Sequence, residues 1–422
     1  MPTPDAVRDQ YETLPYPPRD PAQELRELRS TLSGELKLAS TIFWGGRNVL
    51  GPTFRALDAG CGTGDSAIFL AEQTRHSGGQ VVGFDLSEAS LVIAKARAER
   101  RALDNVRFIR GRIEDLPGLG LGPFDYIVSL GVLHHLPDPA AGLAALRAVL
   151  APAGGLSLMV YAEYGRTPIY QLQKLFQVIA PPAFSTGQRL EIVKRTLSRL
   201  GAEHWASLGR SAFSGEIKAH GDAGLFDLFL HSQDRAYTVP QLHEWVAGAG
   251  LRLLRFDMPI LYEPATSLPG IDITGLDGPA RQAVAELLNG RIKKHTFFAT
   301  DSETAIPEVP AWDDEAAIPD WLMYDPAWLA AQVERRPEIG IAYEDLQFQC
   351  TLDGFRRDFL RLVDGQRTLG EIVTLLQVKH GKLTRAELMA RWDLLYQALS
   401  VFGLAGLMRE PWSCRERLAA SA

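Results

Sequence analysis

The segment from Arg55 to Asp65, which reads RALDAGCGTGD, constrains the fold of this chain more than any other segment. A short apolar run ends in an acid, and glycines then occupy every second position, at Gly60, Gly62 and Gly64. Apolar residues at helical spacing follow directly. This order predicts a strand, a tight turn and a helix N-terminus, with glycines where a ligand approaches backbone amides that no Cβ shields.

The spacing of the three glycines separates this turn from a related one. Dinucleotide-binding turns carry Gly-x-Gly-x-x-Gly, whereas this chain has Gly-x-Gly-x-Gly. The difference counts against a nicotinamide-dependent oxidoreductase. A single glycine-rich turn is weak evidence, so its interpretation depends on the segments that follow.

Those segments alternate between short apolar runs and helical patterns. The runs expected to form further strands are Gln80–Asp85, Val106–Arg110, Phe124–Leu130 and Gly154–Tyr161. Because the connections are short, the crossovers should be right-handed and the sheet parallel. Ligands of such open sheets bind outside the carboxyl ends of the strands. The glycine turn, Asp85, residues 113–115 and residues 129–135 all follow strand ends, and we expect them to converge on one crevice.

This order of motifs resembles the class I methyltransferases that use S-adenosylmethionine, strongly over residues 50–165. The resemblance implies that the glycine turn holds the amino-acid end of the cofactor and that Asp85 binds the ribose hydroxyls. Relatives often carry an acid where this chain has Arg112, so adenine contacts fall to Ile113 and to Glu114 or Asp115. By this resemblance the cofactor-binding residues are Asp58, Gly60, Gly62, Gly64, Asp85, Leu86, Ile113, Glu114, Ser129 and Leu130.

Elementary chemistry agrees with these assignments. A ribose diol presents two hydroxyl donors to one carboxylate, which suits the charge of Asp85. The acid lies about twenty residues beyond the glycine turn, as it does in other nucleotide-binding folds. The helix that begins near Asp65 directs its first amides toward the carboxylate of the cofactor.

The pattern loosens after residue 165. We expect a helical cap over residues 165–236, a sixth strand at Leu251–Asp257 and a last, antiparallel strand at His295–Ala299, which extends the resemblance more weakly to about residue 300. The predicted fold class is α/β: a doubly wound, seven-stranded Rossmann-like sheet with a helical cap insertion and a small, mainly helical C-terminal domain.

A chain of 422 residues predicts more than one domain. We divide it into an N-terminal lid segment (1–50), a methyltransferase domain (51–300), an acidic, proline-containing linker (301–345) and a C-terminal domain (346–422). The last part resembles the winged-helix-like accessory domains of some bacterial methyltransferases. In the lid segment, Tyr11 and Tyr16 are candidates to face the sulfonium cation, since aromatic faces stabilise cations.

Catalytic residues are harder to select because methyl transfer needs no dedicated nucleophile. The candidates are Tyr164, Tyr161 and His134, with strand core as an equal alternative for Tyr161. Of the pair His134 and His135, we expect one to pack in the core and the other to face the cleft. His220 and His231 are expected at the surface. The three scattered cysteines show no metal-ligand spacing, so no metal site is predicted, and Cys61 is interpreted as a space-filler.

The predicted function is methyl transfer from S-adenosylmethionine to a protein side chain, with lysine as one candidate, or to a small molecule. A net charge of −7 and the absence of a basic run argue against nucleic acid as the partner. No apolar stretch approaches the length of a membrane span, and we expect a cytoplasmic protein. Two alternatives remain: a non-catalytic S-adenosylmethionine-binding regulator and, with little support, a nicotinamide oxidoreductase.

Overall fold

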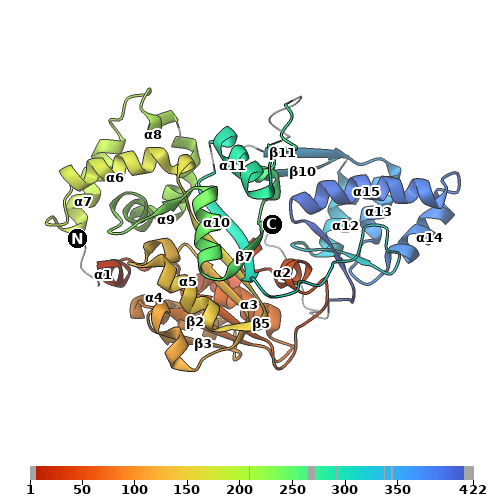
Figure 1. Cartoon of the computed structure of the whole chain (residues 1–422), viewed down its shortest axis with the longest axis horizontal. Helices are drawn as coiled ribbons and strands as arrows, with labels where there is room; N and C mark the ends of the chain where they lie inside the picture. Colours follow the sequence, from red (N-terminus) through yellow and green to blue (C-terminus); the bar gives the residue numbers. More distant parts are fainter. Residues whose placement is uncertain are drawn as a thin grey trace.

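A computed structural model describes residues 6–208, 210–264, 271–290, 292–336, 338–343 and 346–412 (Figure 1). A twisted sheet forms the centre of the first three hundred residues. Its strands are β1 (Arg55–Ala59), β2 (Gln80–Asp85), β3 (Val106–Arg110), β4 (Phe124–Leu130), β5 (Leu150–Ala162), β7 (Leu251–Phe256) and β8 (Lys294–Asp301).

The strand order is β3-β2-β1-β4-β5-β8-β7, and the first five strands are parallel. Strand β8 lies antiparallel between β5 and β7. This arrangement confirms the predicted doubly wound, seven-stranded sheet. One further short strand, β6 (Ala236–Tyr237), pairs with the end of β5.

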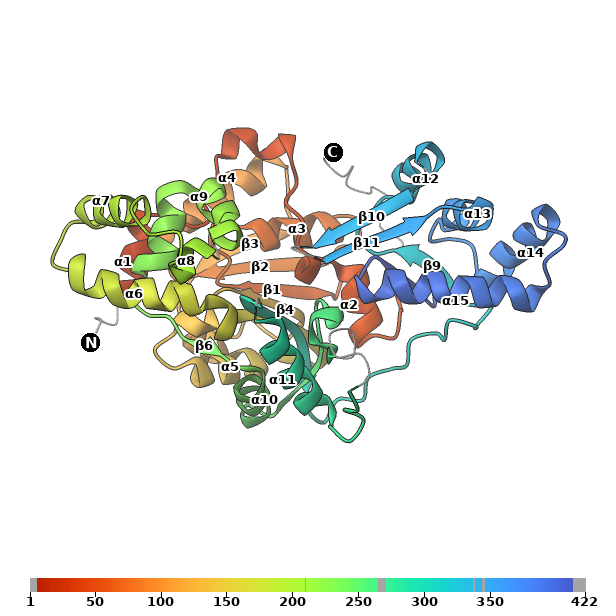
Figure 2. The ribbon, with the colours of Figure 1, turned by 90° about the horizontal axis from the view of Figure 1, so that it is seen from above.

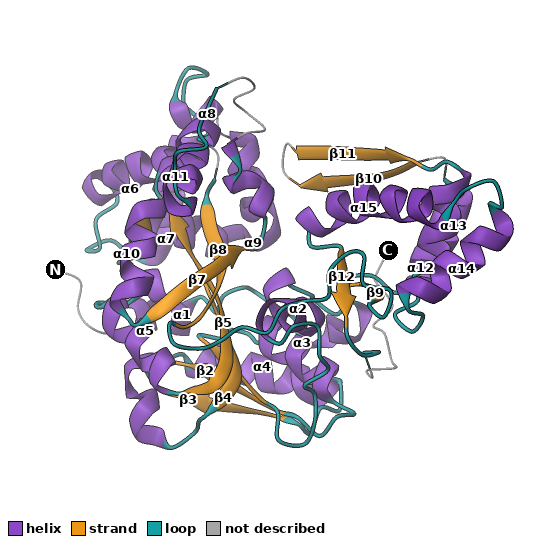
Figure 3. Cartoon of the chain, turned by 45° about the vertical axis from the view of Figure 1, so that its right-hand side comes forward, coloured by secondary structure: helices purple, strands orange, loops and turns teal. Residues whose placement is uncertain are grey.

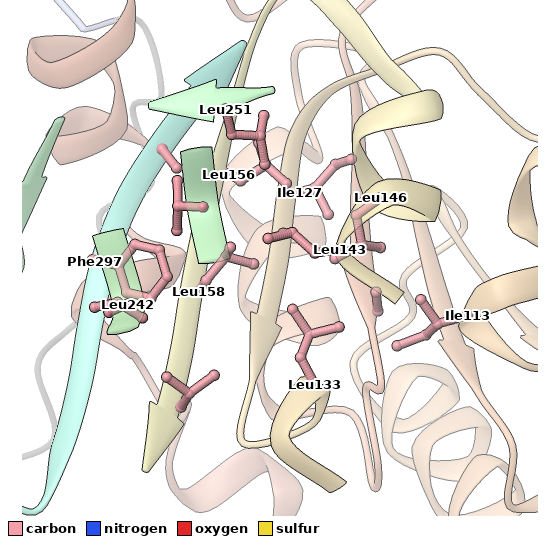
Figure 4. Packing of buried hydrophobic residues seen from close by; sticks show 14 of the residues in the cluster. Ile113, Ile127, Leu133, Leu143, Leu146, Leu156, Leu158, Leu242, Leu251 and Phe297 are labelled. Atoms are coloured by element: carbon pink, nitrogen blue, oxygen red, sulfur yellow. The ribbon is translucent and has the colours of Figure 1, made fainter. Parts of the chain in front are cut away.

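Helices cover both faces of the sheet (Figure 2). They are α2 (Leu36–Phe43), α3 (Asp65–Thr74), α4 (Glu88–Arg100), α5 (Pro139–Ala148), α10 (Val239–Gly248) and α11 (Gly278–Asn289). Alternate residues of a strand point to opposite faces. In β4, Ile127 therefore packs with α5 and α10, whereas Tyr126 and Val128 pack with α2 and α3. Figure 4 shows the first of these two cores, in which Leu143 and Leu146 of α5 meet Ile127.

The cap insertion has a core of its own. It comprises η5 (Tyr164–Arg166), α6 (Thr167–Ile179), α7 (Thr186–Leu197), α8 (Trp205–Leu208) and α9 (Arg210–Leu230). Apolar residues of α6, α7 and α9 pack together, among them Phe176, Val193 and Phe229. Helix α9 is interrupted at Gly221, where a φ of +53° leaves the helical region.

Further short helices lie in the N-terminal fifty residues and in three turns of the sheet domain. They are α1 (Ala6–Thr13), η1 (Pro21–Arg26), η2 (Leu32–Gly34), η3 (Ile113–Leu119), η4 (Leu133–His135) and η6 (Pro259–Tyr262).

The C-terminal part contains four helices and two small sheets (Figure 3). Its elements are β9 (Ile318–Trp321), α12 (Pro326–Arg335), β10 (Glu338–Tyr343), β11 (Leu346–Thr351), α13 (Gly354–Leu362), α14 (Leu369–Lys379), α15 (Arg385–Val401) and β12 (Ala405–Met408). Strand β9 pairs with β12, so residues 318–321, which lie in the segment expected to be a linker, form a strand. The linker expected over residues 301–345 is therefore too long, because its acidic residues also occupy a strand and a helix. The winged-helix resemblance stays a prediction.

Within the described part of the chain, no helix combines the length and the apolar character that crossing a bilayer requires.

Candidate functional site

A cavity of about 650 Å³ opens at the carboxyl ends of β1, β2, β4 and β5, between the sheet, α1 and α9. Such a volume suits a cofactor-sized ligand. Eight of the ten predicted cofactor residues line it, namely Asp58, Gly60, Gly62, Asp85, Leu86, Ile113, Glu114 and Leu130. The crevice expected at the strand ends therefore exists.

The other two predicted cofactor residues support this wall from behind. Gly64 precedes α3 with a φ of +96°, and a Cβ there would lie 2.9 Å from the Cβ of Ala94 on α4. Its role is close helix packing. Ser129 is fully buried, and its hydroxyl donates to the carbonyl of Ala59 at 2.8 Å, which ties β4 to β1.

Glycine is required in the turn because other parts of this chain approach its backbone. A Cβ on Gly60 would lie 2.4 Å from a methyl group of Val132, and one on Gly62 would lie 2.4 Å from the carbonyl oxygen of Tyr16. Both residues also have positive φ values, +80° and +50°. The sequence predicts a ligand next to the backbone of these glycines. In the structure, Tyr16 of the N-terminal segment occupies part of that space beside Gly62.

The carboxylate of Asp85 is tied to the glycine turn and to the next helix. One oxygen accepts from the amide of Gly62 at 2.8 Å, and the other accepts from the amide of Ser87 at 2.9 Å. Burial raises the pKa of Asp85, while the two amides oppose that shift. A carboxylate has about four acceptor positions, so about two remain for a ribose diol.

Asp58 is the second buried carboxyl group on the cavity wall. One of its oxygens has no hydrogen-bond partner among the residues that the structure describes, and burial raises the pKa of the group to about 8. A buried oxygen without a donor fits a cation that brings N–H groups, such as the ammonium of S-adenosylmethionine. Together with Asp85, this oxygen makes the residues present a fit for that cofactor.

The N-terminal segment contacts the glycine turn and the start of α4. Glu12 accepts from the amides of Glu88 and Ala89 at 2.8 and 3.1 Å, so it caps the start of α4. Further along, the hydroxyl of Thr63 donates to the carbonyl of Pro17 at 2.7 Å. Tyr11 and Tyr16 line the cavity.

Polar side chains from distant segments gather at the other end of the cavity. The hydroxyls of Tyr11 and Tyr161 donate to the two oxygens of Asp227, at 3.0 and 3.3 Å. The Arg166 guanidinium stacks on the ring of Tyr161 at 3.5 Å. Burial, followed by the negative charge of Asp227, raises the pKa of Tyr11 well above its usual value. This end of the cavity can orient an acceptor.

Of the three predicted catalytic residues, His134 and Tyr161 are in ring contact, with centroids 4.0 Å apart, but Tyr161 alone of the three lines the cavity. Tyr161 lines the cavity and is buried, whereas Tyr164 is 39% exposed and lies off the cavity wall. His134 is 0% exposed and does not line the cavity, and its neighbour His135 does. One histidine packs and the other faces the cleft, as expected, but His134 is the one that packs.

Four residues at this end were not selected from the sequence. Arg166, Asp227 and His135 line the cavity, and the ring of His231 stacks on that of His135 at 3.7 Å. The surface positions expected for His220 and His231 are wrong, since His220 lines the cavity and His231 is buried. The signal for Asp227 is a lone acid within the apolar run of residues 224–230. Charge inside such a run indicates a buried partner.

Comparison with known proteins gives a consistent assignment. A family model described as a methyltransferase domain matches residues 51–179. An uncharacterized protein of Synechococcus sp. is 30% identical over 315 residues, which cover 69% of this chain and 70% of that protein.

Two functionally named relatives match shorter stretches. The tRNA 5-carboxymethoxyuridine methyltransferase of Escherichia coli is 37% identical over 146 residues, covering 33% of this chain and 54% of the relative. The ubiquinone biosynthesis O-methyltransferase of Acinetobacter baylyi is 32% identical over 100 residues, covering 24% and 40%. The chain thus spans about half the length of these two relatives.

Among solved structures, PKMT2 from Rickettsia typhi in complex with AdoHcy superposes with a TM-score of 0.64. The match covers 89% of this chain and 75% of that one at 17% identity, which shows a shared fold. These matches agree with the strand order and with the two buried carboxyl groups beside the glycine turn. The chain belongs to the class I S-adenosylmethionine-dependent methyltransferases.

Proposed function

We propose that this protein transfers the methyl group of S-adenosylmethionine to an oxygen or nitrogen of a small molecule or of a protein side chain, with lysine as one candidate. One observation carries the proposal. The same cavity is lined at one end by the cofactor residues Asp58 and Asp85, and at the other by Tyr161, Arg166 and Asp227. A methyl acceptor requires polar groups in addition to those that bind the cofactor. A site that binds the cofactor alone does not require them.

The cofactor supplies an activated methyl group, because its sulfur is positively charged. The residues of this chain then have to align an acceptor and exclude water. Tyr161, Arg166 and Asp227 provide oriented polar groups for alignment. Helix α1 and the cap cover the cavity, which limits the access of water.

Nucleic acid is the less favoured acceptor, although one relative is a tRNA methyltransferase. That relative is similar over only 33% of this chain. The net charge of −7 gives little electrostatic attraction for a polyanion. We therefore keep RNA as an outcome of the test. The competing function is a regulator that binds S-adenosylmethionine without turnover.

The test is to incubate purified protein and methyl-labelled S-adenosylmethionine with a fractionated cell extract. Label in a protein band or in a small-molecule fraction is the expected result, and it identifies the acceptor class. Label in the RNA fraction would overturn the acceptor assignment. Binding of S-adenosylhomocysteine in calorimetry, without transfer in any fraction, would mean a regulator. The Asp85→Ala variant is the control for label that does not depend on the cofactor site.

A further inference from the structure

The backbone of Gln233 determines where the protons lie on two buried histidines. Nδ1 of His135 is 2.7 Å from the carbonyl oxygen of Gln233, and the amide of Gln233 donates to Nδ1 of His231 at 3.1 Å. A carbonyl only accepts, so Nδ1 of His135 carries a proton. An amide only donates, so Nδ1 of His231 carries none. The neutral rings are therefore opposite tautomers.

The consequence differs for the two remaining ring nitrogens. Nε2 of neutral His231 carries the proton and lies 3.3 Å from the hydroxyl of Tyr11. Nε2 of neutral His135 carries a lone pair, and His135 is the histidine of this pair that lines the cavity. A basic nitrogen is thus held at the acceptor end of the site, with its orientation set by a backbone carbonyl.

A metal ion is the competing use of these side chains. Atoms of His135, Asp227 and His231 that could ligate an ion lie within 4.8 Å of one another. However, Asp227 already accepts hydrogen bonds from the hydroxyls of Tyr11 and Tyr161, and Nε2 of neutral His231 bears a proton. An ion would have to displace these hydrogen bonds. Proton transfer at His135 uses the arrangement as it stands.

Several titratable side chains surround the ring of His135. Carboxylate oxygens of Asp227 and of Asp234 each lie within 4.8 Å of a ring nitrogen of His135. Burial lowers the pKa of His134 and His231 well below the usual value, so neither competes for the proton. The titratable groups next to the ring are His134 on η4, Tyr161 on β5, Asp227 on α9, and His231 and Asp234 just after α9. Behind them, Arg166 on η5 stacks on Tyr161, and Tyr11 on α1 donates to Asp227.

We propose that His135 is the general base of the methyl transfer, an inference that rests on the proposed function. A lone pair of the acceptor forms the bond to the methyl carbon. The bond from that carbon to sulfur breaks, and its electron pair stays on sulfur as the neutral thioether of S-adenosylhomocysteine. The proton of the acceptor O–H or N–H passes to Nε2 of His135, and the imidazolium later releases it to solvent.

The experiment compares His135→Gln with the wild type and with His76→Gln, in the full chain. The rate of methyl-label transfer to the extract fraction that the wild type labels is measured from pH 5.5 to pH 9, and S-adenosylhomocysteine binding is measured by calorimetry. We expect the wild-type rate to rise with pH and then level off. His135→Gln should transfer label about 100-fold more slowly or worse and lose this pH dependence. Its S-adenosylhomocysteine affinity should be unchanged.

The control and a second variant separate a chemical role from a structural one. His76→Gln changes an exposed histidine that does not line the cavity, and it should keep the wild-type pH profile. His135→Ala should regain transfer when free imidazole is added, in proportion to its neutral form. A wild-type rate and pH profile in His135→Gln, or no rescue of His135→Ala, would overturn the role of His135 and leave the proposed function intact. If the wild type transfers no label to any fraction, the proposed function fails first and this inference with it.

Discussion

Asp58 and Asp85 are both buried carboxyl groups on the cavity wall, yet their surroundings differ. Asp85 accepts two backbone hydrogen bonds, whereas one oxygen of Asp58 has no partner. Backbone amides oppose the effect of burial on both pKa values, with Ser87, Gly62 and Leu86 acting on Asp85 and Ala67 on Asp58. We therefore make a separate prediction for each of these two residues.

For Asp58, we predict proton release when the cofactor product binds. Burial raises the pKa of Asp58 to about 8, so the free protein holds a proton there at pH 7. The ammonium of S-adenosylhomocysteine favours the ionised form and lowers that pKa. Affinity should therefore rise with pH and level off above about pH 8. Calorimetry in buffers of different ionisation enthalpy measures the released proton.

Asp58→Asn is the matched control for this effect. It keeps the shape of the side chain and removes its titration. The pH dependence of affinity below about pH 8 should flatten in this variant. An unchanged pH dependence would assign the linkage to another group.

For Asp85, we predict that Asp85→Ala weakens S-adenosylhomocysteine binding by about 2–4 kcal/mol, since charge-assisted hydrogen bonds to the ligand are lost. The change also frees the amides of Gly62 and Ser87. Calorimetry measures the affinity, and Asp115→Ala, which lies off the cavity wall, is the control. Equal affinities in wild type and Asp85→Ala would remove Asp85 from the site.

Among the elements, the N-terminal segment shows how much of the site depends on contacts between distant parts of the chain. Glu12 caps α4 across 76 residues of sequence, and Ser87 at the start of that helix donates to the carbonyl of Tyr11 at 3.2 Å. The cap helix α9 holds the same segment from the other side through Asp227.

We predict that Glu12→Ala loosens this lid. The loss of a capping carboxylate costs about 0.5–2 kcal/mol, which corresponds to an increase of about 2- to 30-fold in the open population. Proteolysis within residues 6–20 and S-adenosylhomocysteine dissociation should both become faster, as followed by mass spectrometry and stopped flow. Glu27→Ala is the control, because that exposed side chain pairs only locally with Arg29. Unchanged cleavage in Glu12→Ala would show that other contacts hold the lid.

At the scale of the whole molecule, the C-terminal part packs against the methyltransferase domain (Figure 1). Ile318, Leu322 and Met408 share one core with α2 and with the sheet. At the same interface, Lys37 of α2 pairs with Asp320 of β9 at 2.8 Å, with side chains 10% and 0% exposed. The two parts should therefore unfold cooperatively.

Lys37→Met tests this coupling. It leaves Asp320 buried without the ammonium, and removing one partner of a buried pair costs about 3–5 kcal/mol. Urea unfolding should show that loss, and the double variant Lys37→Met/Asp320→Asn should recover part of it. A stability loss below about 1 kcal/mol, as for an exposed pair, would contradict the buried ion pair.

The sequence alone determined the succession of strands along the chain up to β5, the glycine turn and the position of Asp85 at a strand end. These features depend on short-range patterns, such as an apolar run, a turn residue with positive φ or an acid at a strand end, and each pattern lies within a few residues. The strand at residues 318–321 is not predicted because acidic composition resembles that of a linker, and the pairing of β9 with β12 reveals the strand.

The acceptor end was decided by tertiary structure. His135, Asp227 and His231 lie almost a hundred residues apart in sequence at their widest, and Gln233 acts on the two histidines through its backbone, which leaves no side-chain signature. Which of His134 and His135 faces the cavity depends on how η4 packs against β5. Local sequence predicts where strands end, but the side chains that meet across a cavity depend on how the cap folds back over the sheet.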